Sequence, residues 1–96
     1  MRERWAFALR MIRRFRGAIR GRLPVTVPAT DGQRLVLEVG LETIRALETI
    51  PIDANQFLYL RLRVNSAMRY HLWRQSGAAR YEAEMVYRRV QALAGE

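Results

Sequence analysis

The chain has no cysteine among its 96 residues, which excludes a disulfide framework and a thiolate metal site. This composition is typical of a reducing compartment, and we expect a cytoplasmic protein. No stretch comes near the roughly 20 consecutive apolar residues that a membrane-spanning helix needs. Arginine interrupts every apolar run near the start, so the sequence also predicts no secretory signal.

Groups that could carry out chemistry are scarce as well. The chain has two serines and one histidine, and Ser66 and His71 fall on different sides of a helix. Glu82 and Glu84 diverge by about 200° on a helix, so they do not form a paired acid and base. The glycines match neither phosphate-loop pattern. We therefore expect a protein that is not an enzyme and that holds no cofactor and no metal.

Lysine is missing too, so all 17 basic residues are arginines, against nine acidic residues and a net charge of +8. Arginine makes planar, bidentate contacts with phosphate and carboxylate groups, although a GC-rich coding bias would give the same composition. Residues 1–22 hold eight arginines and one glutamate, a charge of +7, whereas residues 23–96 sum to only +1. Nearly all the excess charge therefore belongs to the N-terminal segment.

This N-terminal segment has the apolar period of a helix. Over residues 2–20 the apolar side chains fall on one side, and most arginines fall on the other. The apolar side comprises Trp5, Ala8, Leu9, Met11, Ile12, Phe15, Ala18 and Ile19. Two glycines and Leu23-Pro24 end the pattern, so we predict an arginine-rich amphipathic helix within residues 1–22.

Residues 23–39 carry the pattern of a β-hairpin. Apolar and β-branched residues flank Asp31-Gly32, and an Asp-Gly pair favours the tight turn that joins two strands. We predict strands at about 24–29 and 34–39, the first at an edge because its two prolines cannot donate to a ladder. Residues 41–50 predict a short helix that ends before the next proline.

Residues 54–94 favour a helical hairpin. Asp53 is a good N-cap with Gln56 at the capping-box position, and Gly77 is placed to end a first helix at about residue 76. A strand is the alternative for residues 57–64, which also alternate in period two. Such a strand would display aromatic and arginine side chains of the kind that bind single-stranded nucleic acid.

The last segment carries a helical seam whose positions repeat at intervals of seven. Its apolar positions are Leu72, Ala79, Ala83, Val86, Val90 and Leu93. This seam could pack inside the protein or against a second copy of the chain. The segments together predict one small α+β domain over residues 1–96, mostly helical: an N-terminal helix, a β-hairpin, a short helix and a helical hairpin.

The arginine side of the first helix is the candidate binding surface. It comprises Arg10, Arg13, Arg14, Arg16, Arg20 and Arg22. Our first interpretation is that these side chains neutralise phosphates of DNA or RNA without reading the base sequence. About five neutralised phosphates would give a log–log salt slope near −4.5. The alternatives are an acidic protein partner that receives the amphipathic helix, an anionic membrane surface, or a solvated helix face with no partner.

Overall fold

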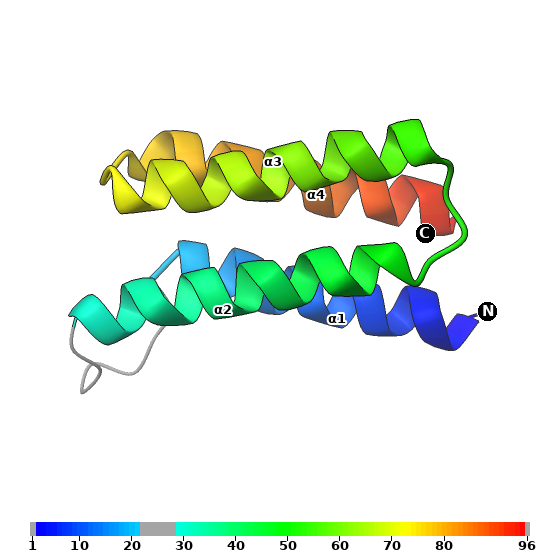
Figure 1. Ribbon diagram of the computed structural model, residues 1–96, viewed down its shortest axis with the longest axis horizontal. Helices are drawn as coiled ribbons and strands as arrows, with labels where there is room; N and C mark the ends of the chain where they lie inside the picture. Colours follow the sequence, from blue (N-terminus) through cyan, green and yellow to red (C-terminus); the bar gives the residue numbers. More distant parts are fainter. Residues whose placement is uncertain (1, 22–28, 96) are drawn as a thin grey trace.

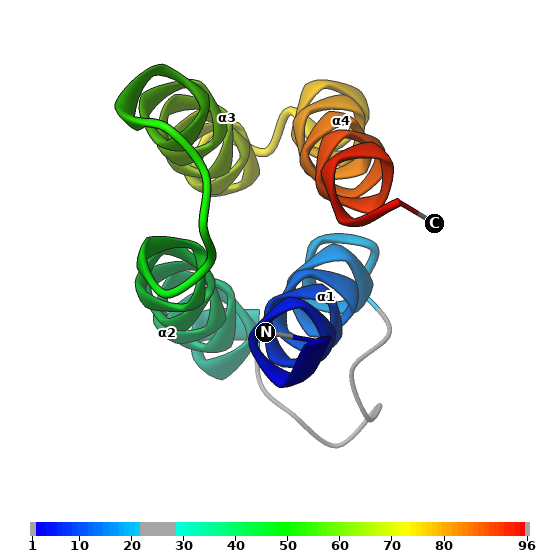
Figure 2. The ribbon, with the colours of Figure 1, turned by 90° about the vertical axis from the view of Figure 1, so that its right-hand side faces the viewer.

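The computed structural model describes residues 2–21 and 29–95, and over these residues it contains four α-helices and no strand. The helices are α1 (Arg2–Ile19), α2 (Ala29–Glu48), α3 (Ala54–Leu72) and α4 (Ser76–Ala94). Consecutive helices run antiparallel, and the four occupy the corners of a square, with α1 beside α2 and α4 and diagonal to α3 (Figures 1 and 2). The predicted α+β class is therefore wrong, and the described chain is a four-helix bundle.

Helix α1 confirms the predicted N-terminal amphipathic helix. Seven of its apolar side chains are buried, and they form the stripe that faces the other helices. They are Ala8, Leu9, Met11, Ile12, Phe15, Ala18 and Ile19. The helix ends at Ile19, and Gly21, two residues later, has a φ of 73° in the left-handed region that glycine adopts without a steric penalty.

Helix α2 overturns the predicted hairpin. Asp31-Gly32 lies in its first turn, and the predicted strand 34–39 and most of the predicted short helix 41–50 belong to this one helix. The other predicted strand, 24–29, lies outside the described residues except for its last position, which begins α2.

The reason is that burial in α2 follows a helical period across the whole segment. Its fully buried positions recur every three or four residues, through both the predicted strand and the predicted short helix. They include Val36, Val39, Thr43 and Leu47. β-Branched residues have only a weak preference for strands, and packing against α1 and α3 outweighs it. An isolated two-stranded hairpin would have had no further strand against which to pack.

Helices α3 and α4 confirm the C-terminal pair but move the turn between them. The Asp53 side chain accepts a hydrogen bond of 2.7 Å from the Gln56 backbone N–H, as an N-cap does, and residues 57–64 are helical. The turn is formed by residues 73–75, and Arg74 takes the left-handed conformation with φ 59°. Gly77, the expected end of the first helix, lies instead in the first turn of α4.

The core contains most of the predicted C-terminal seam and one close approach between helices. Ala79, Ala83, Val86 and Val90 are fully buried inside the bundle, whereas Leu72, the first position of the seam, is 41% exposed. At Gly40 of α2, an added Cβ would clash with the Sδ of Met68 and lie 3.2 Å from the Phe15 ring. The absence of a side chain at Gly40 therefore lets α2 approach α1 and α3 closely.

Candidate functional site

Arginines of α1 and arginines of α4 lie along the outer side of the contact between these two helices. On α4, Arg80, Glu84 and Arg88 are spaced by four residues and share one side of the helix. On α1, the side nearest α4 carries Arg13, Arg16 and Arg20. We call this surface the arginine face and define it by Arg13, Arg16, Arg20, Arg80 and Arg88.

Glu84 is the acidic centre of the arginine face. Its Oε2 atom lies 3.3 Å from a nitrogen of Arg16 and 3.2 Å from a nitrogen of Arg20, and its Oε1 atom lies 3.5 Å from Nε of Arg88. One carboxylate thus holds three guanidinium groups, which leaves this cluster with two uncompensated positive charges. The Glu84 side chain is 26% exposed, less than the side chains of Arg20 and Arg88 that it contacts.

The Tyr87 side chain contacts two arginines of the arginine face, Arg13 and Arg16. The Arg16 guanidinium lies 4.1 Å from the centre of the Tyr87 ring, and the Arg13 guanidinium lies 5.7 Å from it. Arg13 also donates a hydrogen bond of 3.1 Å from Nε to the Tyr87 hydroxyl. The half-buried ring therefore fixes the position of guanidinium groups that a solvated helix would leave free to rotate.

The structure brings together three of the six arginines predicted as the binding surface, namely Arg13, Arg16 and Arg20. Arg10 is exposed on the outer side of α1, with its guanidinium 5.8 Å from the Phe7 ring. Arg14 faces α2 instead and lies 3.5 Å from Glu42, in a pair whose side chains are both at least half exposed.

Arg22, the sixth predicted residue, lies outside the described residues. Sequence reasoning missed Arg80, Arg88, Glu84 and Tyr87, all on α4. Their spacing along α4 was visible in the sequence, but only the fold shows that this side of α4 lies against α1.

The net charge of residues 23–96 is close to zero, but positive and negative charges are unevenly distributed among the helices. Residues 29–48 hold four acidic residues and two arginines, a charge of −2. Residues 54–94 hold seven arginines and two glutamates, a charge of +5, which equals the charge of residues 2–19. Basic side chains thus dominate on α1, α3 and α4, and acidic side chains dominate on α2.

A second cluster of arginine, tyrosine and glutamate joins α3 to α4. Arg63 lies 3.0 Å from Glu82, and the guanidinium groups of Arg63 and Arg89 lie 4.7 and 5.1 Å from the Tyr59 ring centre. Burial opposes the charge of Arg63, but Glu82 and Tyr59 stabilise it and raise its pKa overall. The Nε atom of Arg63 is buried without a hydrogen-bond partner among the described residues.

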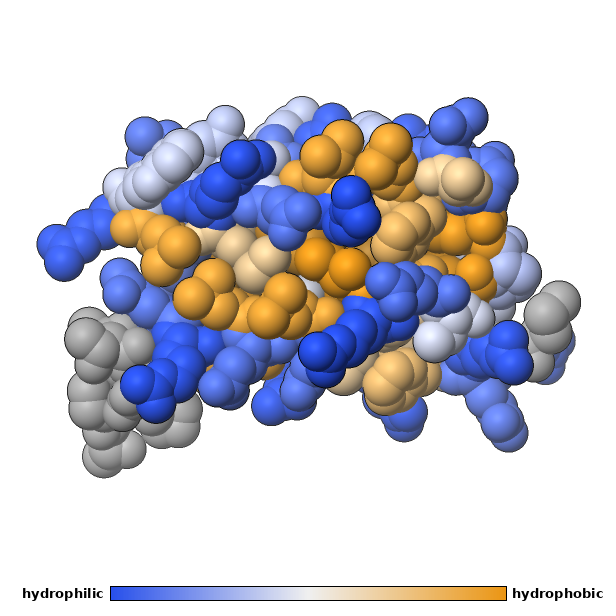
Figure 3. Space-filling model, in the orientation of Figure 1, coloured by the Kyte–Doolittle hydropathy of each residue, from blue (hydrophilic) through white to orange (hydrophobic). Residues whose placement is uncertain are grey.

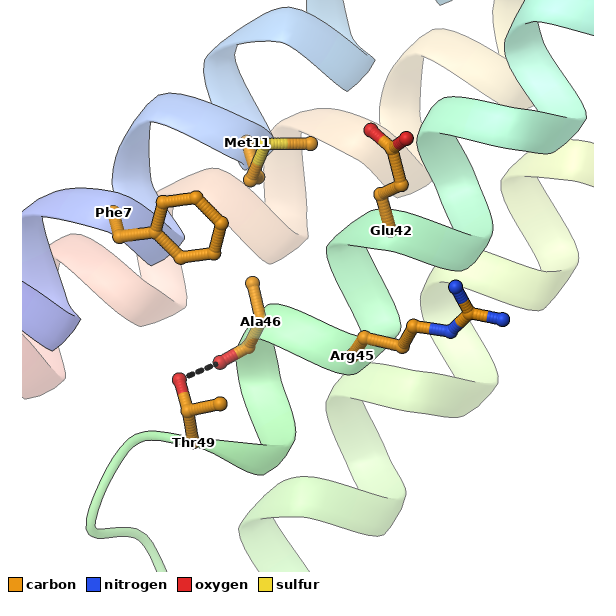
Figure 4. A pocket seen from close by; sticks show the side chains of 6 residues that line it. All are labelled: Phe7, Met11, Glu42, Arg45, Ala46 and Thr49. Carbon is orange, nitrogen blue, oxygen red and sulfur yellow. Dashed lines mark hydrogen bonds between the residues drawn. The ribbon is translucent and has the colours of Figure 1, made fainter.

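Groups suited to catalysis or metal binding do not gather in the described part of the chain, where no three His, Cys, Asp or Glu side chains cluster. His71 is half-buried, and burial lowers its pKa from 6.5. A shallow hollow of about 240 Å³ opens between α1 and α2 (Figure 4). It is lined by Phe7, Met11, Glu42, Arg45, Ala46 and Thr49. The Thr49 hydroxyl donates to the Ala46 carbonyl, so the hollow offers mainly apolar surface, suited to one small apolar group.

Comparison with family models, with curated proteins and with solved structures gives no match. Among the described helices, none is both long enough and apolar enough to cross a lipid bilayer. The function is therefore inferred from the chemistry of the arginine face.

Proposed function

We propose that the protein binds the phosphate backbone of nucleic acid through the arginine face. The observation that carries this proposal is the excess of positive charge: Arg16, Arg20 and Arg88 share the single carboxylate of Glu84, and Tyr87 holds Arg13 and Arg16 in place. Guanidinium groups contact phosphates in bidentate geometry, and a fixed group loses less conformational entropy on binding than a mobile one.

The dimensions of the face suit a nucleic-acid backbone. Arg13 and Arg20 are seven residues apart on α1, which corresponds to about 10 Å along the helix axis. Duplex DNA presents about six phosphate charges over that length. If Glu84 offsets one of the five arginines, about four phosphates are neutralised, and the log–log salt slope is about −3.6. Contacts of this kind position the protein without selecting a base sequence.

An acidic protein could pair with the same guanidinium groups. The two alternatives in which the apolar side of α1 enters a protein groove or a membrane would require α1 to leave the bundle. Phe15 and Ile19 are at most 4% exposed, so the folded protein does not offer them to a partner. We place the proposed activity in the cytoplasm, in keeping with a cysteine-free chain.

The test compares two double variants that lose the same charge. Arg20→Gln with Arg88→Gln removes two exposed arginines from the arginine face, and Arg45→Gln with Arg61→Gln removes two exposed arginines from α2 and α3. Binding to a short DNA duplex and to single-stranded RNA is followed by fluorescence anisotropy between about 50 and 200 mM salt. Over this range the unchanged protein should lose about 150-fold in affinity.

The first variant should bind weakly, with a salt slope reduced by about 1.8, because two phosphate contacts are lost. The second should keep the slope of the unchanged protein. Equal weakening of both variants would show that net charge alone attracts the nucleic acid, and the proposal would fail. Binding to anionic vesicles or to an acidic peptide, with no binding to DNA or RNA, would assign the face to one of those partners instead.

A further inference from the structure

The side of the bundle opposite the arginine face carries several exposed apolar side chains. Leucines of α2 and α3 remain exposed there, and we call this surface the leucine face; it comprises Leu37, Leu41, Leu58 and Leu62. Figure 3 shows apolar side chains gathered over these two helices, which lie side by side. Leu41 and Leu62 are each 52% exposed, although the bundle buries most of its other aliphatic side chains.

The leucine face follows a second helical period, separate from the one that builds the core. On α2, residues 34, 37, 41, 44 and 48 are spaced by three and four, and they are Arg34, Leu37, Leu41, Ile44 and Glu48. This is the spacing of the contact positions in a coiled coil. On α3, Leu58 and Leu62 begin a similar stripe that continues through Asn65. Two exposed stripes with coiled-coil spacing indicate a surface that packs against other helices.

The charges at the two ends of the α2 stripe identify the partner. Arg34 lies seven residues before Leu41, and Glu48 lies seven residues after it, so both are on the same side of α2 as Leu41. An identical α2 lying antiparallel across this one, with Leu41 at the centre, would place each Arg34 opposite the Glu48 of the other copy. Both side chains are exposed, and neither makes an ion pair within residues 2–21 and 29–95.

We infer that the protein forms a twofold-symmetric dimer through the leucine face, with the axis passing beside Leu41 and Leu62. Counted from the α2–α3 connection, these two residues stand at nearly the same height in the bundle, so one axis serves both helices. The bundle measures 37 by 22 Å across the side that carries the leucine face, and a standard interface buries about 800 Å² of each partner, so a dimer of standard size would cover most of this side. This inference does not depend on the proposed function, because it uses the opposite side of the bundle.

Sedimentation equilibrium of the full chain over a range of concentrations tests the dimer. The unchanged protein should dimerise, and Leu41→Glu with Leu62→Glu should make it monomeric while its circular dichroism spectrum stays helical. Tyr81→Glu is the matched control, since Tyr81 is an aromatic residue on α4 with 58% exposure, and this variant should remain dimeric. A monomeric unchanged protein, or a leucine variant that still dimerises, would overturn the inference.

The antiparallel arrangement is tested by exchanging charges. Arg34→Glu alone and Glu48→Arg alone should each raise the dimer dissociation constant about tenfold, because symmetry turns two attractive pairs into two repulsive ones. The chain that carries both substitutions should recover the original constant. A double variant as weak as either single variant would contradict the antiparallel pairing.

Discussion

Replacing Glu84 by glutamine should strengthen the binding of nucleic acid. The substitution keeps the size of the side chain and removes the carboxylate that contacts Arg16, Arg20 and Arg88. A phosphate about 7 Å from that carboxylate is repelled by about 0.6 kcal/mol at the dielectric constant of water. For two adjacent phosphates this amounts to roughly an eightfold gain in affinity at low salt. The loss of three partly exposed ion pairs should lower stability by only about 1 kcal/mol.

The assay is the same salt titration of binding to a DNA duplex. Glu84→Gln should make the log–log slope steeper by about 0.9, since one more arginine becomes available to a phosphate. Glu42→Gln is the matched control, because it removes an equal charge beside Arg14, outside the arginine face. The reasoning would be refuted if Glu84→Gln bound no more tightly than Glu42→Gln.

The remaining predictions concern stability. Asp53→Ala removes the N-cap of α3 and should cost about 1 kcal/mol, seen as a thermal midpoint about 4–8 °C lower by circular dichroism. Gly40→Ala should lower the free energy of unfolding, measured in urea, by about 1 kcal/mol net, because crowding against Met68 exceeds the gain in helix propensity. Gly17→Ala should raise this free energy by up to about 1 kcal/mol, because the space around its added methyl group is open. Burial lowers the pKa of His71 in the folded protein. Between pH 6.5 and this lowered pKa, the unfolded chain therefore binds a proton that the folded chain does not bind. Stability should therefore fall as the pH drops from 6.5 towards the folded pKa, and urea titrations of His71→Gln should lack this fall.

The helices with a clear apolar period and a local capping signal could be predicted from the sequence. Helix α1 has an apolar stripe and a glycine at its end, and Asp53 marks the start of α3 through a bond to a residue three positions later. Such signals depend on neighbours along the chain, so they do not need knowledge of the fold.

Helix α2 could not be predicted in this way because it is apolar on two sides. Val36 and Val39 face the core, while Leu37 and Leu41 face outward, so the local pattern resembles a strand. The Asp31-Gly32 pair strengthened the prediction of a hairpin, because such a pair favours a tight turn. That turn forms only where a strand lies on each side of it. Only the packing of α2 between α1 and α3 distinguishes the two structures.

Only part of the candidate site could be predicted from the sequence. The arginines of α1 stood out through their density, but the contribution of α4 depends on which side of that helix lies against α1. Glu84 and Tyr87 decide how much of the charge remains and how firmly it is held, and both are more than 60 residues away from the arginines of α1 that they contact. Contacts over such separations cannot be predicted from local spacing.

The central claim, that the arginine face holds phosphates, is tested most directly by nuclear magnetic resonance of the arginine side chains. With ¹⁵N-labelled arginine, the Nε–H signals report every basic residue of a chain that has no lysine. Addition of a short DNA duplex should shift the signals of Arg16, Arg20 and Arg88 and leave that of Arg45 on α2 in place. Shifts confined to α2 and α3, or no shift at a salt concentration where the duplex binds, would contradict the account.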